Sequence, residues 1–169
     1  TAAVLLMDLD HFKFVNDSLG HATGDELLRL AADRIVASVP DSDLVGRHGG
    51  DEFVVVLRDL DDLDGATRVA ERLVEAFRAP IGVHDDELFT TASIGVAVGY
   101  DGVDADTLLA EADTALYTAK RQGRDRYAVF TSELRDQVTE RLRIENGLRL
   151  ALDHPDRVTL RSSIGGLRL

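Results

Sequence analysis

The chain of 169 residues contains no cysteine and no tryptophan, and only one methionine and three prolines. Without cysteine there is no disulfide framework and no zinc–thiolate site. No apolar run reaches the roughly 20 residues that a membrane-spanning helix needs, and no signal-peptide pattern opens the chain. Basic residues are scarce: 19 Lys and Arg stand against 31 Asp and Glu, for a formal net charge of −12. This balance argues against a general nucleic-acid-binding surface. We expect a cytoplasmic domain, or the cytoplasmic part of a larger protein, with no membrane insertion in this segment.

What the chain does contain is enough apolar sequence for one well-packed core. Apolar runs of strand length alternate with segments of helical periodicity. The expected order is strand, helix, strand hairpin, helix, strand hairpin, helix and strand. The corresponding ranges are about 1–7, 24–38, 44–57, 64–78, 81–98, 104–122 and 127–130. This order predicts an α+β fold of the ferredoxin-like or polymerase-palm type, in which helices flank a mainly antiparallel central sheet.

The chain is organised around a predicted hairpin whose turn is the pair Gly49-Gly50. Two-residue turns of this kind need positive φ, which glycine adopts easily. Two adjacent carboxylates, Asp51 and Glu52, follow the turn and precede the apolar run 53–57. That run is typical of a strand in the middle of a sheet. Acids at the mouth of a buried strand need a cation, a hydrogen-bond donor or water, and a divalent-metal site is the leading interpretation.

A second pair of acids, Asp8 and Asp10, follows the first apolar run. If the two strands are neighbours, Asp8 and Asp51 come together, as carboxylates do in Mg²⁺ sites that handle phosphates. Lys13 is one candidate phosphate cation. Lys120 and Arg124 are spaced i, i+4, which would place both on one helix face. The alternative for this pair is a simple complement to the C-terminal end of a helix.

The residues between the first strand and the first helix are interpreted as a polar connection, from 11 to 24. Thr23 followed by Glu26 matches a capping box that begins a helix. In that interpretation, Asp25 could be no more than an acid in the first helical turn. The acidic stretch 59–64 is interpreted as a solvated loop leading into a helix.

Five blocks of the sequence together resemble the GGDEF family of diguanylate cyclases. They are residues 7–17 (MDLDHFKFVND), 20–25 (GHATGD), 47–53 (RHGGDEF), 92–97 (ASIGVA) and 112–125 (ADTALYTAKRQGRD). The likeness covers about residues 1–131, with the blocks in the family's order and at its spacings. It implies that two GTP molecules are joined into cyclic di-GMP with release of two pyrophosphates, by a homodimer in which each domain carries one GTP.

The resemblance also implies a role for individual residues. The metal ligands, for Mg²⁺ or Mn²⁺, would be Asp8, the carbonyl of Leu9, and Asp51. The residues that act in catalysis would be Asp51, Glu52 and Lys13. The GTP-binding residues would be Phe12, Asn16, Asp25, Gly50, Lys120 and Arg124, with Asn16 and Asp25 reading the guanine edge.

The expected organisation is a GGDEF domain over 1–131 that lacks the family's N-terminal helix, a connector helix over 132–152, and a tail over 153–169 that could begin an EAL-like domain. The chain would then come from a tandem GGDEF–EAL protein, or from one with another linked regulatory domain. This organisation supports an alternative function: a weak or inactive GGDEF module that binds GTP and regulates a linked EAL phosphodiesterase.

Overall fold

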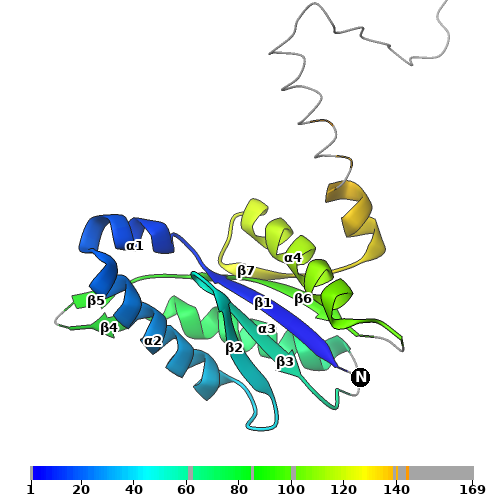
Figure 1. Ribbon diagram of the computed structural model, residues 1–169, viewed down its shortest axis with the longest axis horizontal. Helices are drawn as coiled ribbons and strands as arrows, with labels where there is room; N and C mark the ends of the chain where they lie inside the picture. The colour runs from blue at the N-terminus through cyan, green and yellow to red at the C-terminus, as the bar shows by residue number, and fades with distance from the viewer. Residues whose placement is uncertain are drawn as a thin grey trace, which may run out of the picture. The chain divides into compact units, whose positions relative to one another are not determined.

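The computed structural model describes residues 2–60, 63–84, 86–99, 102–138, 140 and 144. The chain divides into two compact units, Thr1–Arg135 and Asp136–Leu169. The elements of the first unit are β1 (Ala3–Leu9), α1 (Phe12–Leu19), α2 (His21–Ser38), β2 (Leu44–Gly49), β3 (Glu52–Leu57), α3 (Leu63–Arg78), β4 (Ile81–Val83), β5 (Asp86–Leu88), β6 (Ala92–Val98), α4 (Ala105–Arg121) and β7 (Arg126–Val129) (Figure 1).

Beyond β7, residues 132–138, 140 and 144 are helical, and the rest of the predicted connector helix and tail lies outside the described residues. Within the described part of the chain, no helix is both long and apolar enough to span a bilayer.

The main sheet has five strands in the order β2-β3-β1-β6-β7. All its pairings are antiparallel except β6 with β7, which is parallel. The strand β1 lies at the centre and is buried along its whole length (Figure 1). A strand paired on both sides and covered on both faces has a continuous apolar run, which explains the pattern of residues 3–7. The predicted α+β fold with a mainly antiparallel sheet is confirmed.

Helices cover both faces of this sheet. Side chains alternate along β1, so Leu5 and Met7 point to one face and Val4 and Leu6 to the other. The first face packs against α2 and α3, and the second against α4. Each buried leucine or valine stabilises the fold by about 1.5–3 kcal/mol relative to exposure. The two cores together hold β1 in place, and with it the polar residues at its C-terminal end.

The chain after β1 differs from the prediction. Residues 12–19 form helix α1, and α2 begins at His21. The capping box is wrong: Thr23 lies inside α2 and its hydroxyl donates to the carbonyl of Leu19, four residues back. The break between the helices falls at Gly20, whose φ of 86° ends one helix and begins the next. Phe12, Val15 and Leu19 are spaced i, i+3 and i+7, which is a helical stripe that the prediction of a polar connection missed.

The second hairpin also differs. The strands β4 and β5 pair only with each other, as a separate two-stranded sheet. The strand β6, which was predicted as part of the same arm as β5, pairs with β1 and β7 instead. Between β5 and β6 the hydroxyl of Thr90 donates to the carbonyl of Asp10 at 3.1 Å. This bond ties the segment to the end of β1 and separates the two strands.

Candidate functional site

The hairpin between β2 and β3 carries two of the predicted site residues. Its turn is Gly50-Asp51 and not Gly49-Gly50, because the register shifts between Arg47 and Gly49. Gly50 has a φ of 50°, and no positive φ is found at Gly49. The Arg47 guanidinium donates to the Gly50 carbonyl from Nε at 2.9 Å and from Nη2 at 2.6 Å. These two hydrogen bonds therefore hold the turn in one conformation, which fixes the direction of the backbone at Asp51 and Glu52.

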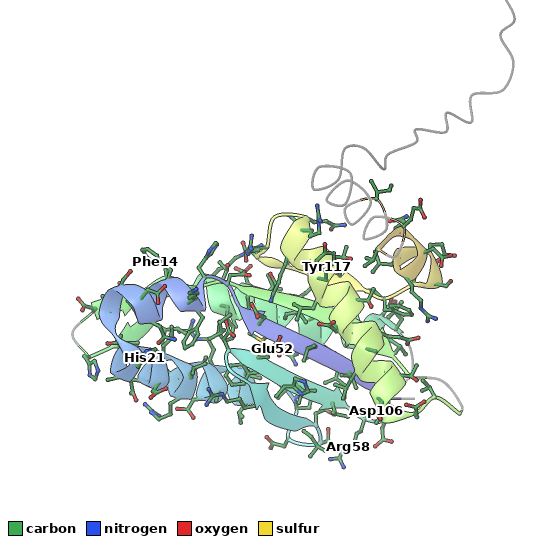
Figure 2. The ribbon with its side chains drawn as sticks, turned by 45° about the horizontal axis from the view of Figure 1, so that its top comes forward. Phe14, His21, Glu52, Arg58, Asp106 and Tyr117 are labelled. Carbon is green, nitrogen blue, oxygen red and sulfur yellow. The ribbon has the colours of Figure 1, made fainter. Side chains whose placement is uncertain are left out.

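The acids of the hairpin lie beside Asp8. The strands β1 and β3 are neighbours, and their register pairs Asp8 with Glu52. The N–H of Leu9 donates to the Asp51 carbonyl at 3.3 Å. Figure 2 shows Glu52 over the middle of the sheet, between the α1–α2 end with Phe14 and His21 and helix α4 with Tyr117. The juxtaposition expected from the sequence is therefore present in the fold.

Lys120 reaches the same place from α4. Its Nζ lies 2.6 Å from Oδ2 of Asp8. Asp8 is buried, with only 8% of its surface exposed. Burial raises the pKa of the Asp8 carboxyl above its ordinary 3.8, and Lys120 opposes this shift, while the charges of Asp51 and Glu52 add to it. Three acids face one ammonium group here, so the site has an excess of negative charge.

A carboxyl with a raised pKa destabilises the folded chain once it ionises. The protonated carboxyl contributes to stability below its ordinary pKa of 3.8, and this contribution is lost as the pH rises through the raised pKa of the folded chain. We therefore expect Asp8→Asn, with a chelator and no nucleotide, to raise the free energy of unfolding at pH 7 by about 1 kcal/mol. Lys120, with its side chain 30% exposed, can turn to water in this variant.

Urea unfolding at pH 7 and at pH 4 measures this gain in stability, which should narrow as the pH falls toward the ordinary pKa of 3.8. The exposed Asp41 supplies the control, since Asp41→Asn should change little at either pH. A loss of stability in Asp8→Asn at pH 7 would mean that the Lys120 pair outweighs the burial of the charge.

The donors around Asp8 fit a hard divalent cation. Two carboxylates and a backbone carbonyl are oxygen ligands, and Mg²⁺ typically takes one or two carboxylates and fills its other positions with phosphate oxygens and water. Among the described residues there is no group of three or more His, Cys, Asp or Glu side chains placed to hold a metal. Asp8, Leu9 and Asp51 would thus hold the cation only together with a phosphate-bearing ligand.

Helices α1 and α2 bring Asn16 against Gly24, the residue before Asp25. The Asn16 carboxamide lies directly over Gly24, so closely that a Cβ at Gly24 would overlap its oxygen. The ring of Phe12 also faces this Cβ position, at 3.3 Å. Asn16 is half-buried and Asp25 is exposed. The amide of Asn16 can therefore occupy this position only because Gly24 has no side chain.

An open cleft of about 530 Å³ runs between α2 and β2 from the Asp25 end. Its walls include Asp25, Leu28, Arg47 and Phe53. Sequence reasoning assigned no role to Arg47. Its place between the hairpin carbonyl and this cleft could be found only from the pairing of β2 with β3.

Asp10 is a buried acid that sequence reasoning also left without a role. It is 2% exposed, and its carboxylate accepts hydrogen bonds from the hydroxyls of Thr91 and Ser93, both at 2.7 Å. It also accepts from the backbone N–H of Asp125 at 3.1 Å, and Nε of Arg124 lies 3.8 Å from it. Lys120 in the last turn of α4 therefore faces Asp8 of β1, and Arg124 beyond the helix faces Asp10, which follows β1.

The expectation that Lys120 and Arg124 share a helix face is wrong. The helix ends at Arg121, and Arg124 lies in the turn beyond it with a φ of 62°. Lys13 is exposed on the first turn of α1, and Gly50 has open space where a side chain would stand. The structure thus gathers Asp8, Leu9, Asp51, Glu52, Lys120 and Arg124 around the end of β1, and Phe12, Asn16 and Asp25 at the α1–α2 contact. The roles of all these residues stay predictions.

The fold is shared with solved structures of GGDEF domains. The family model described as "Diguanylate cyclase, GGDEF domain" matches residues 1–126, and the chain belongs to this family.

Curated relatives and a solved structure agree with this assignment. The chain is 43% identical over 152 residues to the bifunctional diguanylate cyclase/cyclic di-GMP phosphodiesterase MucR of Pseudomonas aeruginosa, covering 89% of this chain and 22% of MucR. It is 44% identical over 124 residues to the diguanylate cyclase TpbB of the same organism, covering 72% of this chain and 28% of TpbB. A structure of the TpbB GGDEF domain superimposes with a TM-score of 0.77 at 39% identity, over 82% of this chain and 81% of that one. The chain spans less than a third of the length of these curated relatives.

Proposed function

We propose that this domain condenses two molecules of GTP into cyclic di-GMP, with Mg²⁺ or Mn²⁺ bound by Asp8, the Leu9 carbonyl and Asp51. The observation that carries the proposal is the meeting of Asp8 with Asp51 and Glu52 on adjacent strands, beside Lys120 and Arg124. Acids that would repel each other in an empty site suit a cation that carries a triphosphate. With GTP as substrate, the proposal places the domain in the cytoplasm.

In the proposed reaction, the 3′-hydroxyl oxygen of each GTP attacks the α-phosphorus of the other, and the bond to pyrophosphate breaks. The bound cation, when present, would polarise the α-phosphate. Lys120 and Arg124 would neutralise the phosphate oxygens, and Lys13 would reach the same charge from α1. Glu52 would accept the hydroxyl proton or contact a second cation. Two domains must face each other, since each would hold one GTP.

The guanine end of the proposed site depends on α1 and α2. Asn16 offers both a donor and an acceptor, and Asp25 accepts from the N–H groups of guanine. Gly50 has no side chain, and its open surroundings leave room for a ligand to approach the backbone.

Purified chain incubated with GTP and Mg²⁺, followed by chromatographic separation of the nucleotides, tests the proposal. Formation of cyclic di-GMP supports it. Recovery of GTP unchanged, together with saturable GTP binding, supports the alternative of a regulatory module linked to a phosphodiesterase. MucR, by its name a bifunctional diguanylate cyclase and cyclic di-GMP phosphodiesterase, supports this alternative. A chain that neither binds nor converts GTP would contradict both.

Gly24→Ala should weaken GTP binding about tenfold. The added methyl group would overlap the Asn16 carboxamide and push it from its place, so that its hydrogen bonds to guanine, worth about 1–1.5 kcal/mol, would be lost. Isothermal calorimetry with GTP in the presence of Ca²⁺ measures the change.

Gly82→Ala is the matched control, because a Cβ at Gly82 meets nothing within 4 Å. Its affinity for GTP should equal that of the wild type. If a correctly folded Gly24→Ala variant bound GTP with wild-type affinity, Asn16 would not be a guanine-binding residue.

A further inference from the structure

The turn after α4 has an unusual backbone. Arg124 and Asp125 are consecutive non-glycine residues with φ of 62° and 49°, directly after Gly123 at 118°. The left-handed region is unfavourable for a non-glycine residue, somewhat less so for aspartate than for arginine. Two such residues in a row persist only where surrounding contacts hold them.

The backbone of the turn is tied at two points. The N–H of Arg124 donates to the carbonyl of Ala119 at 3.1 Å, and the N–H of Asp125 donates to Oδ2 of Asp10 at 3.1 Å. Asp10 is itself immobilised by the hydroxyls of Thr91 and Ser93. A buried carboxylate that accepts several hydrogen bonds is a rigid anchor.

The side chain of Asp125 is tied from the opposite direction. Nε of Arg78, in the last turn of α3, lies 3.2 Å from both carboxylate oxygens of Asp125. Arg78 is in turn held by Glu75 at 2.8 Å. Asp125 is therefore bound to Asp10 through its backbone N–H and to Arg78 through its carboxylate. We call Asp10, Asp125 and Arg78 the turn clamp.

The clamp determines where Arg124 stands. Its Nε lies 3.8 Å from Oδ1 of Asp10, and 46% of its side chain is exposed. Guanidinium groups bind phosphate best when two terminal nitrogens approach it together, which requires a fixed orientation. An arginine on a free loop would lose rotamer entropy on binding; one already oriented would lose less.

We propose that the turn clamp positions Arg124 for the triphosphate of GTP, and that Arg78, which lies on the outside of the domain, is a positioning residue for this site. The inference rests on the proposed function, since GTP is its ligand. It adds α3 to the elements that shape the site. The simpler interpretation is a surface ion pair between Arg78 and Asp125 with no effect on the turn.

Nucleotide binding separates these two interpretations. The ligand is 3′-deoxy-GTP, which lacks the attacking hydroxyl, compared with GMP, which lacks the β- and γ-phosphates. The ion pair between Arg78 and Asp125 is exposed to water and therefore weak, so Arg78→Ala should weaken 3′-deoxy-GTP binding only about two- to fivefold and leave GMP binding unchanged. In an Arg124→Ala background, the same change should have no further effect. Equal weakening for both nucleotides, or an undiminished effect without Arg124, would overturn the inference.

Amide hydrogen exchange of the nucleotide-free chain tests the clamp without any ligand. The Asp125 amide should exchange about two- to fivefold faster in Arg78→Ala. Arg72→Ala is the control: Arg72 lies on the same helix and bonds the Ser38 carbonyl at 2.6 Å, away from the turn. Unchanged exchange in Arg78→Ala would overturn the clamp whether or not the chain binds GTP. Faster exchange in a chain that binds no GTP would support the clamp and contradict the proposed function.

Discussion

Asp51→Ala is expected to lower the rate of cyclic di-GMP formation at least about a thousandfold. Asp51 is one of two carboxylates proposed for the cation, and removing a group that organises developing phosphate charge typically costs several kcal/mol of transition-state stabilisation. The fold should survive, because the turn conformation depends on Gly50 and on the two bonds from Arg47 to the Gly50 carbonyl. The Asp51 side chain supplies none of these contacts.

Rates of product formation at saturating GTP and Mg²⁺, measured by chromatography, check this prediction, with circular dichroism as the test of folding. Asp106→Ala is a suitable control because Asp106 is exposed in the first turn of α4, at the opposite end of the helix from Lys120. If the wild type binds GTP without converting it, the same variant should instead remove the Mg²⁺ dependence of GTP binding. A variant that keeps a tenth of the wild-type rate would exclude Asp51 as a metal ligand.

Gly95→Ala should produce the largest loss of stability, about 3 kcal/mol or more. Gly95 lies in the middle of β6, where α4 crosses the sheet. A Cβ there would overlap the carbonyl oxygen of Ala112 and the backbone nitrogen of Leu116. Backbone atoms of a packed helix cannot rotate away as a side chain can, so α4 must shift as a body. That shift would also carry Lys120 away from Asp8.

Urea unfolding followed by circular dichroism measures the loss. Gly82→Ala is again the control, since Gly82 is a strand glycine with a non-positive φ and open space around it, and its replacement should change stability by less than about 0.5 kcal/mol. A loss below about 1 kcal/mol in Gly95→Ala would mean that the contact between α4 and β6 is loose. The two glycines therefore separate close packing from ordinary strand propensity.

Much of this architecture could be predicted because the signals are local. The apolar run before Asp8 predicts β1, and the periodic apolar residues of α3 and α4 predict those helices nearly to their ends. Each of these elements buries a stripe that its own sequence shows. The GGDEF resemblance is likewise a matter of residue order and spacing, and needs no folded structure.

The predictions failed where long-range contacts override local pattern. The turn at Gly50 is moved by one residue because of a bulge between Arg47 and Gly49, and that bulge exists only when β2 pairs with β3. The arm 88–98 is divided where Thr90 bonds the end of β1. Arg124 leaves the helix because Gly123 turns the chain and Asp10 anchors the backbone N–H of Asp125.

The residue types that this chemistry needs, and their order along the chain, can be read directly from the amino-acid sequence. The contacts that bring these residues together cannot be read from it. Asp8 lies opposite Glu52 because β1 is inserted between β3 and β6, and Lys120 reaches Asp8 because α4 packs close over Gly95. These contacts join residues that are far apart in the chain, so their free energy comes from the packing of the whole domain and not from the propensity of any single segment.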